Sequence, residues 1–257
     1  MLGRREAGPG AGGAVRGVVG RDHRLFGGSP YAAPPGGALR WQPPRPARTW
    51  DGVRDATAFG PRCLQDLDGG VELGRQTDED CLNLHVWTPA VDSDPPPPRP
   101  VMVWIHGGAF IFGEGLQTDG GTRGDLLAAN HGVVVVSMNY RLGPFGFLAH
   151  PSLAETPDGP SGNYAMRDQQ LALEWVRDHI ASFGGNPDDV TLFGESAGGI
   201  SVCLHLAMPS SAGLFHKAIS QSGLCDSGIS TRAEAEAYRR RFEHSERMDS
   251  YVVRKRD

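Results

Sequence analysis

One serine of this chain lies in a sequence pattern that can make it a nucleophile. The pattern Gly194-Glu195-Ser196-Ala197-Gly198 follows the apolar run Val190–Phe193 and precedes Ile200–Leu206, which reads as strand, sharp turn and helix. Such a turn lifts the serine oxygen clear of the sheet at a helix N-terminus, where the helix dipole and the amide of Ala197 favour a developing anion. A Cβ at either flanking glycine would collide with the neighbouring strand and helix. The pattern therefore predicts attack by Ser196 on a carbonyl group, and a turn serine without chemistry is the alternative.

A second pattern supplies what that attack would need. The run Pro100–Ile105 reads as a buried strand, and it leads directly into His106-Gly107-Gly108-Ala109. Small residues after a strand allow backbone amides to point at a substrate oxygen without obstruction by side chains. The alternative is a tight turn with no function. Both patterns in this order favour an oxyanion loop followed by a nucleophile.

Strands and helices that alternate along the chain must position these two patterns. Residues 132–138 form an unbroken apolar run, which is typical of a strand covered on both faces by helices. Residues 164–183 have apolar side chains at helical spacing and end at Gly184-Gly185, and residues 215–222 read as the next strand. This alternation predicts an open, mostly parallel α/β sheet with Ser196 at the carboxyl end of a strand.

The first hundred residues are expected to be less regular. Residues 1–13 are rich in Gly, Ala and Arg without apolar periodicity, so we expect them to be disordered. Residues 15–20 and 24–26 suggest a small hairpin, and residues 81–87 alternate as a half-buried strand does. The proline-rich segment 94–100 is expected to be a hairpin loop that leads into the strand before His106.

Composition excludes several classes of partner. The 257 residues carry a formal net charge of −5, which provides no footprint for nucleic acid or an anionic membrane, and no apolar run is long enough to span a bilayer. The N-terminus has no apolar signal-peptide core, so the chain is expected to be cytoplasmic if Met1 is the true start, with secretion left open. The four cysteines include no C-x-x-C pair, so a zinc site is not expected. No cofactor is expected.

The cysteines leave one question open. Cys203 falls on the helix behind Ser196, where a free cysteine is usually a small core residue. Cys63 and Cys81 enclose a short loop, and they are either bridged in an oxidising compartment or reduced in the cytosol. Their spacing alone does not decide between these states.

Taken together, the motifs resemble those of the type-B carboxylesterase family. This is the α/β-hydrolase family that includes cholinesterases, carboxylesterases and bacterial p-nitrobenzyl esterases. The resemblance runs in one order over residues 14–237 and rests on the segments at residues 31–35, 79–84, 104–110, 139–141, 162–163, 168–169, 183–187, 194–199 and 220–223.

The resemblance implies specific roles. Ser196 would be the nucleophile, and the amides of Gly108, Ala109 and Ala197 would form the oxyanion hole. Cys63 and Cys81 match the family's first disulfide, and Arg40 and Glu79 match a family salt bridge, although as partly exposed charges they could equally be unpaired. His106 would pack beneath the oxyanion loop and would not be the base, because in this fold the acid and the histidine follow the serine.

The chain departs from the family after the serine. A serine hydroxyl needs a histidine to take its proton and a carboxylate to orient that histidine, and only three histidines follow Ser196. His205 is nine positions along the same helix, about 13 Å away, and His216 precedes a strand at the opposite end from Ser196. His244 lies in the charged segment 238–257, which does not resemble the family. We therefore expect an α/β-hydrolase fold truncated after the nucleophile helix and the following strand, without its catalytic acid and histidine.

Three functions follow from these expectations. The first is a carboxylic ester hydrolase that acts on a small-molecule ester through an acyl-Ser196 intermediate. The second is a catalytically inactive binding protein with the hydrolase fold, against which the intact serine motif argues. The third is a thioesterase or amidase of the same fold. The identity of the ester and the oligomeric state do not follow from the sequence.

Overall fold

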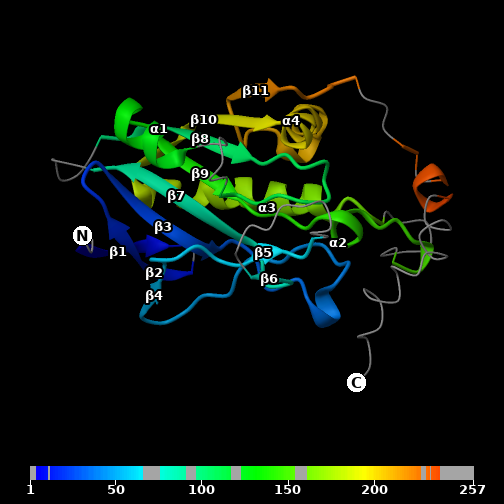
Figure 1. Cartoon of the computed structure of the whole chain (residues 1–257), viewed down its shortest axis with the longest axis horizontal. Coiled ribbons are helices and arrows are strands. Elements are labelled where there is room, and N and C mark those ends of the chain that lie inside the picture. The colour runs from blue at the N-terminus through cyan, green and yellow to red at the C-terminus, as the bar shows by residue number, and fades with distance from the viewer. Residues whose placement is uncertain are drawn as a thin grey trace.

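The computed structural model describes most of the chain (Figure 1). It covers residues 4–10, 12–65, 76–90, 97–116, 123–153, 161–226, 230–231 and 233–237, with side chains from residue 12 onward. The strands are β1 (Arg4–Gly10), β2 (Gly13–Val19), β3 (His23–Pro30), β4 (Val53–Asp55), β5 (Arg62–Cys63), β6 (Thr77–Asp78), β7 (Asn83–Pro89), β8 (Arg99–Ile105), β9 (Val134–Met138), β10 (Gly185–Glu195) and β11 (Lys217–Gln221). The α-helices are α1 (Gly124–His131), α2 (Gly143–Phe147), α3 (Tyr164–His179) and α4 (Ala197–Ala207). Short 3-10 helices are η1 (Gly37–Leu39), η3 (Pro151–Leu153), η4 (Ile180–Phe183) and η5 (Pro209–Ser211).

Nine strands form one large sheet in the order β1-β2-β3-β7-β9-β8-β10-β11, with β4 paired to β2. The strands from β1 to β9 along this order pair antiparallel, whereas β9, β8, β10 and β11 pair parallel. The parallel half carries both predicted motifs at the carboxyl ends of β8 and β10. The predicted α/β architecture, with its nucleophile motif at the end of a parallel strand, is confirmed.

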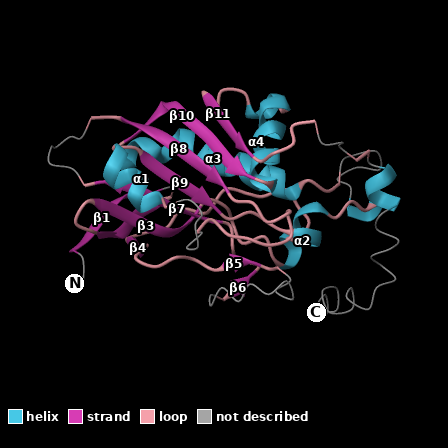
Figure 2. Cartoon of the chain, turned by 45° about the horizontal axis from the view of Figure 1, so that its top comes forward, coloured by secondary structure: helices cyan, strands magenta, loops and turns pink. Residues whose placement is uncertain are grey.

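Helices cover both faces of this sheet (Figure 2). Along β9, Val134 and Val136 are fully buried in the main core, which includes residues of α3 and α4. Val135 points to the other face, where it packs with Trp87 of β7 and Ala128 of α1. Successive side chains of a strand alternate between faces, so an unbroken run of valines places apolar groups against both helical layers.

The helix predicted from residues 164–183 is present as α3 followed by the single turn η4. Nine of its residues in α3 are buried, in agreement with its helical apolar spacing. Gly184 ends η4 with φ 81°, a left-handed conformation that glycine adopts without steric cost. The predicted C-cap is therefore confirmed. It turns the chain from α3 into β10 and so sets the start of the strand that carries Ser196.

Three expectations for the first hundred residues are wrong. Residues 4–10 form β1, paired antiparallel with β2, because backbone hydrogen bonds to a neighbouring strand need no apolar side chains. All seven residues of β7 are buried, since both faces are covered by other elements. The chain from β7 to β8 does not form a hairpin loop, because β9 lies between these two strands. The hairpin predicted at residues 15–26 is present as β2 and β3.

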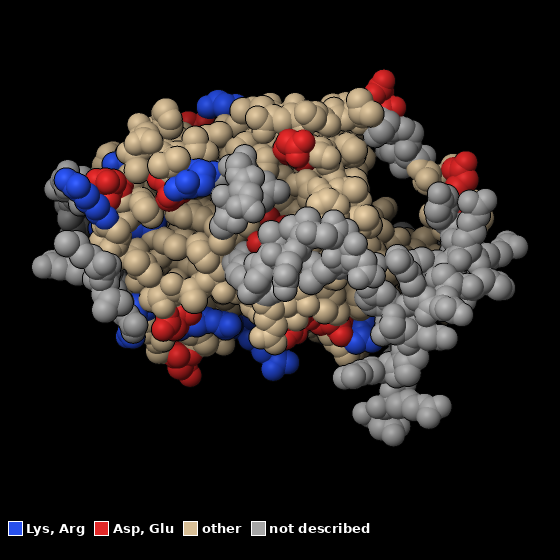
Figure 3. Space-filling model, in the orientation of Figure 1, with Lys and Arg blue, Asp and Glu red and all other residues tan. Residues whose placement is uncertain are grey.

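Charged side chains of both signs are interspersed on the face shown in Figure 3. Several are paired locally, such as Arg177 with the neighbouring Asp178 and Lys217 with Asp189. Within the described ranges, the helices are too short or too polar to cross a membrane.

Candidate active site

Ser196 stands between the end of β10 and the start of α4. Its backbone has φ 55° and ψ −119°, a conformation that a residue with a side chain adopts only when its surroundings hold it there. The amide of Ser196 donates a hydrogen bond of 2.9 Å to the carbonyl of Gln221 at the end of β11. The serine is partly exposed, whereas Ala197 beside it is buried. The strained turn therefore presents the side chain of Ser196 at the carboxyl edge of the sheet.

The glycines around Ser196 allow this turn to form. A Cβ on Gly194 would lie 2.5 Å from the carbonyl carbon of Gly198. A Cβ on Gly198 would lie 2.0 Å from the carbonyl oxygen of Ile105, the last residue of β8. Both distances are far below van der Waals contact, so the strand and helix can approach this closely only without side chains. The collision expected from the sequence is thus present at both glycines.

The parallel pairing of β8 with β10 brings the second motif beside the first. Ile105 pairs with Gly194, so Gly107 follows directly at the level of the serine turn. A Cβ on Gly107 would lie 2.8 Å from the carbonyl oxygen of Glu195 and 3.3 Å from Cβ of Ser196. The next two residues have left-handed backbones, with φ 104° at Gly108 and 51° at Ala109. The structure thus places Gly107, the residue before Gly108 and Ala109, beside Ser196 on two adjacent segments.

His106 supports the glycine loop from below. Its ring is fully buried and stacked on Tyr140, with centroids 4.2 Å apart, and Tyr140 donates a hydrogen bond to the carbonyl of His106. Nδ1 lies 2.7 Å from the carbonyl of Gly107, which can only accept, so Nδ1 carries the proton. Burial lowers the pKa of His106 to about 4, which keeps the ring neutral. His106 is therefore a packing residue beneath the loop, as the sequence predicts.

The described histidines that follow Ser196 in the sequence have partners other than Ser196. His205, on α4, is buried with Nδ1 2.8 Å from Ser211 Oγ and Nε2 3.1 Å from Gln169 Oε1, and burial lowers its pKa to about 4. His216 accepts a hydrogen bond at Nδ1 from the amide of Val190, five residues before the end of β10. His244 lies outside the described residues. Within the described part of the chain, neither His205 nor His216 is placed to take a proton from Ser196.

This geometry agrees with the comparisons to known proteins. The family model for the carboxylesterase family matches residues 9–250. The chain belongs to the carboxylesterase family. The match extends beyond the range 14–237 over which the sequence motifs show the resemblance, and it enters the charged segment after residue 237.

Several relatives and solved structures that this carboxylesterase-family chain resembles are esterases. The chain is 47% identical over 215 residues to para-nitrobenzyl esterase of Bacillus subtilis, covering 82% of this chain and 42% of that protein. It is 45% identical over 231 residues to fumonisin B1 esterase of Sphingopyxis macrogoltabida, covering 88% and 41%. A solved thermophilic PNB esterase superposes with TM-score 0.82 at 43% identity, over 91% of this chain and 47% of that one. A Geobacillus stearothermophilus carboxylesterase gives TM-score 0.84 at 38% identity, over 96% and 50%. The chain thus spans less than half the length of these curated relatives.

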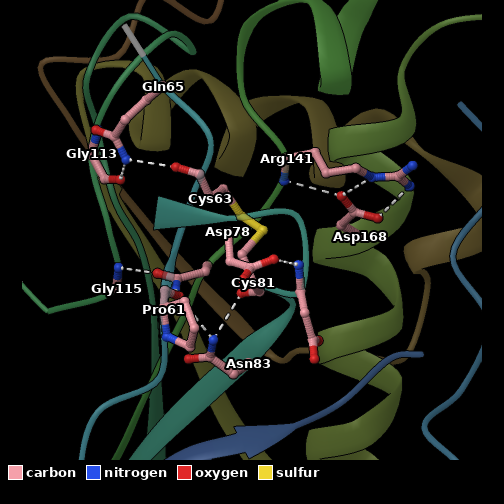
Figure 4. The surroundings of a disulfide bond; sticks show 12 residues. Pro61, Cys63, Gln65, Asp78, Cys81, Asn83, Gly113, Gly115, Arg141 and Asp168 are labelled. Atoms are coloured by element: carbon pink, nitrogen blue, oxygen red, sulfur yellow. Dashed lines mark hydrogen bonds and ion pairs between the residues drawn. A yellow bond between two sulfur atoms is a disulfide. The ribbon is translucent and has the colours of Figure 1, made fainter. Parts of the chain in front are cut away.

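In this family member, a disulfide-linked loop supports the segment that follows the glycine loop (Figure 4). Cys63 and Cys81 are joined and almost fully buried. Two residues after Cys63, the side-chain amide of Gln65 accepts a 3.0 Å hydrogen bond from the amide of Gly113 and donates one of 3.0 Å to its carbonyl. This pairing ties the return of the glycine loop to the disulfide. Sequence reasoning missed Gln65, because nothing in its local pattern indicates a partner 48 residues away.

Two ion pairs hold the surrounding loops. Arg141, just after β9, forms a buried pair with Asp168 of α3, with Nε to Oδ2 at 2.8 Å and Nη2 to Oδ1 at 2.7 Å. The carboxylate also accepts the backbone amide of Arg141, so the arginine is fixed by both main chain and side chain. Arg40 pairs with Glu79 through two hydrogen bonds, one of 2.7 Å from Nε to Oε2, which decides the question that the sequence left open.

The remaining cysteines are also joined. Cys203 of α4 forms a disulfide with Cys225, which follows β11. The expectation that Cys203 is a free core residue is therefore wrong. The cause lies in the tertiary structure, because α4 and β11 contact each other and bring the two cysteines to a Cα separation of 5.3 Å.

Proposed function

We propose that Ser196 is the nucleophile of a carboxylic ester hydrolase. The observation that carries this proposal is the strained backbone of Ser196, held between β10 and α4 beside Gly107 of the glycine loop. Strain at a partly exposed serine has to be maintained by the surrounding structure, and such residues cluster at active sites. Membership of the carboxylesterase family and the esterase names of the relatives support the same reaction.

The reaction would proceed in two steps. Ser196 Oγ forms a bond to the carbonyl carbon of the ester, and the carbonyl π electrons move to the oxygen, which becomes an oxyanion. The backbone amides of Gly108, Ala109 and Ala197 are the proposed donors to that oxyanion. Collapse breaks the bond to the alcohol oxygen, which leaves with a proton, and water then releases the carboxylic acid from Ser196.

The serine proton requires a general base, and this requirement limits what the described residues can do alone. His205 and His216 are engaged elsewhere, and a serine hydroxyl without a base is a poor nucleophile near neutral pH. The complete catalytic cycle is therefore proposed for a protein in which a histidine and a carboxylate reach Ser196. For the 257-residue chain alone we expect slow acylation and slow or no turnover.

An activated aryl ester tests the proposal without requiring a base. At alkaline pH, p-nitrophenyl acetate should transfer one acetyl group to the peptide that contains Ser196, as detected by peptide mass mapping. Ser196→Ala should abolish this modification. Ser222→Ala is the matched control, because Ser222 also has a positive φ and is exposed but lies outside the elbow. Acetylation that persists in Ser196→Ala, or that is lost equally in Ser222→Ala, would contradict the assignment.

The same experiment separates the alternative functions. An inactive binding protein with this fold would show no acetyl group on Ser196 at any pH. A thioesterase or amidase would accelerate acyl transfer from a thioester or an anilide, relative to hydrolysis of the same compound by hydroxide, by a larger factor than it accelerates transfer from an aryl ester. We expect the largest factor for the ester.

A further inference from the structure

The disulfide between Cys203 and Cys225 encloses the backbone contacts that hold the serine turn. Its two cysteines are 22 residues apart in sequence, and the chain between them includes the rest of α4 and all of β11. In Figure 1, β11 and α4 lie side by side at one end of the sheet. The bond therefore ties the end of the last described strand to the helix that begins at the nucleophile.

Three contacts lie next to this bond. Gln221 accepts the hydrogen bond from the amide of Ser196, and Ser220 Oγ donates one of 3.0 Å to the carbonyl of Gly199 in α4. A Cβ on Gly223 would lie 2.4 Å from the carbonyl carbon of Gly199, so the two backbones pack directly against each other. Sγ of Cys203 is 3.6 Å from Oγ of Ser220. The disulfide is thus continuous with the packing that positions the elbow.

Apart from the disulfide, this segment is held by the parallel pairing of β11 with β10, the ion pair between Lys217 and Asp189, and its contacts with α4. All five residues of β11 are exposed, and the only described strand that pairs with β11 is β10. An edge strand of this kind opens more readily than a central one, because one row of its backbone groups has no neighbouring strand. A covalent link to α4 therefore adds to the restraint that pairing with β10 gives to residues 217–226.

The two disulfides of the chain differ in access to solvent. Cys63 and Cys81 are 2% and 1% exposed. Cys225 is exposed and Cys203 is partly buried. Thiol–disulfide exchange requires a thiolate to approach a sulfur directly, so a reagent in solution reaches the second disulfide first.

We propose that Cys203–Cys225 is a site of thiol–disulfide exchange with small dithiols, and that its reduction releases the segment after β10 from the nucleophile helix. In the first step, a dithiol thiolate attacks Sγ of Cys225, and Cys203 leaves as a thiolate that takes up a proton. The second thiolate of the reagent then attacks the mixed disulfide and releases Cys225, which also takes up a proton. The protein gains two electrons, and the dithiol is oxidised to its cyclic disulfide.

Reduction would act on the serine turn through the contacts named above. Without the covalent tie, the locally open state of residues 217–226 gains conformations, so opening becomes more frequent. Each opening breaks the hydrogen bond from Ser196 to Gln221 and the packing of Gly223 on Gly199. The bond is in this sense a redox-sensitive clamp on the elbow.

Titration of the full chain with dithiothreitol tests the first part of the proposal. Free thiols are alkylated at each concentration and located by peptide mass mapping. We expect Cys203 and Cys225 to be alkylated while Cys63 and Cys81 remain bridged, over at least about a tenfold range of dithiothreitol. Simultaneous loss of both disulfides, or earlier loss of Cys63–Cys81, would overturn the proposed site.

Hydrogen exchange on the selectively reduced chain tests the clamp. Amides in residues 217–226 and at the start of α4 should exchange about tenfold faster than in the oxidised chain, whereas those of β9 should not change. The double variant Cys203→Ser, Cys225→Ser should match the reduced chain, and its exchange in residues 217–226 should not change at dithiothreitol concentrations that leave Cys63–Cys81 bridged. Selective reduction with unchanged exchange in residues 217–226 would overturn the clamp. That result needs only the native sequence, so it decides the question even if the variant fails to fold.

Discussion

Replacing Gly198 by alanine separates the effect of close backbone packing from the effect of helix propensity. Gly198 is the second residue of α4, and alanine is the better helix former there by up to about 1 kcal/mol. Propensity alone therefore predicts that Gly198→Ala stabilises the protein. The new Cβ, however, would lie 2.0 Å from the carbonyl oxygen of Ile105 in β8.

The size of this clash decides whether Gly198→Ala stabilises or destabilises the protein. Ordinary contact begins near 3.4 Å, so the first turn of α4 and the end of β8 would have to separate by more than 1 Å. No rotamer relieves the clash, because both groups belong to fixed backbone in a densely packed region. Overpacking of this kind destabilises a protein by about 1–3 kcal/mol or more, which exceeds the gain in propensity. We expect a net loss of about 2 kcal/mol and a fall in Tm of about 4–8 °C.

Urea denaturation followed by tryptophan fluorescence measures this change in stability. Trp104 of β8 is a suitable probe because it is buried, with its ring centroid 5.0 Å from that of Phe193 in β10. Gly36→Ala is the matched control, because Gly36 has φ −92° and its new Cβ would meet only ordinary contacts from 3.4 Å. The control should change the free energy of unfolding by less than about 0.5 kcal/mol. A Gly198→Ala variant as stable as the native chain would refute the packing argument and would place α4 farther from β8.

Three further predictions concern charge, pH and the sheet edge. Asp168→Ala should destabilise the fold by about 3–5 kcal/mol, because it leaves the buried Arg141 guanidinium without its carboxylate. Asp168→Leu combined with Arg141→Met should recover most of that loss in urea denaturation. A double variant no more stable than the single one would contradict this. The pKa of His205 is lowered by burial from 6.5 to about 4, so the unfolded chain binds the proton more readily and stability should fall as pH decreases between these values, by up to about 3 kcal/mol. Buried His106, whose pKa is also lowered to about 4, adds a similar dependence over the same pH range, so His205→Gln should remove about half of the total slope. An unchanged pH slope of the unfolding free energy would show that His205 does not contribute to it. Ile219→Lys should raise the concentration at which the chain aggregates, as measured by light scattering, because Ile219 is 45% exposed on the edge strand β11. Leu126→Lys, at a similarly exposed position on α1, should have a smaller effect, and equal effects would argue against edge-to-edge association.

Local sequence was sufficient to predict the structure of segments for which only a few backbone conformations are possible. The Gly-x-Ser-x-Gly turn could be predicted because the close approach of Gly194 to Gly198 and of Gly198 to Ile105 leaves glycine as the only residue that fits at either position. The valines of β9 and the helical spacing of α3 could be read for the same kind of reason, since side-chain periodicity follows directly from backbone geometry. These elements place the two motifs at one edge of a parallel sheet, and this part of the prediction is correct.

The pairing of distant segments was decided only by the tertiary structure. Insertion of β9 between β7 and β8, addition of β1 to the sheet, and the disulfide between Cys203 and Cys225 all join residues whose local patterns do not name a partner. The support that Gln65 provides to Gly113 is of the same kind. Periodicity shows which face of an element is apolar, but many strand orders bury the same faces. The choice among them depends on long-range packing and hydrogen bonding, and these are properties of the folded chain as a whole.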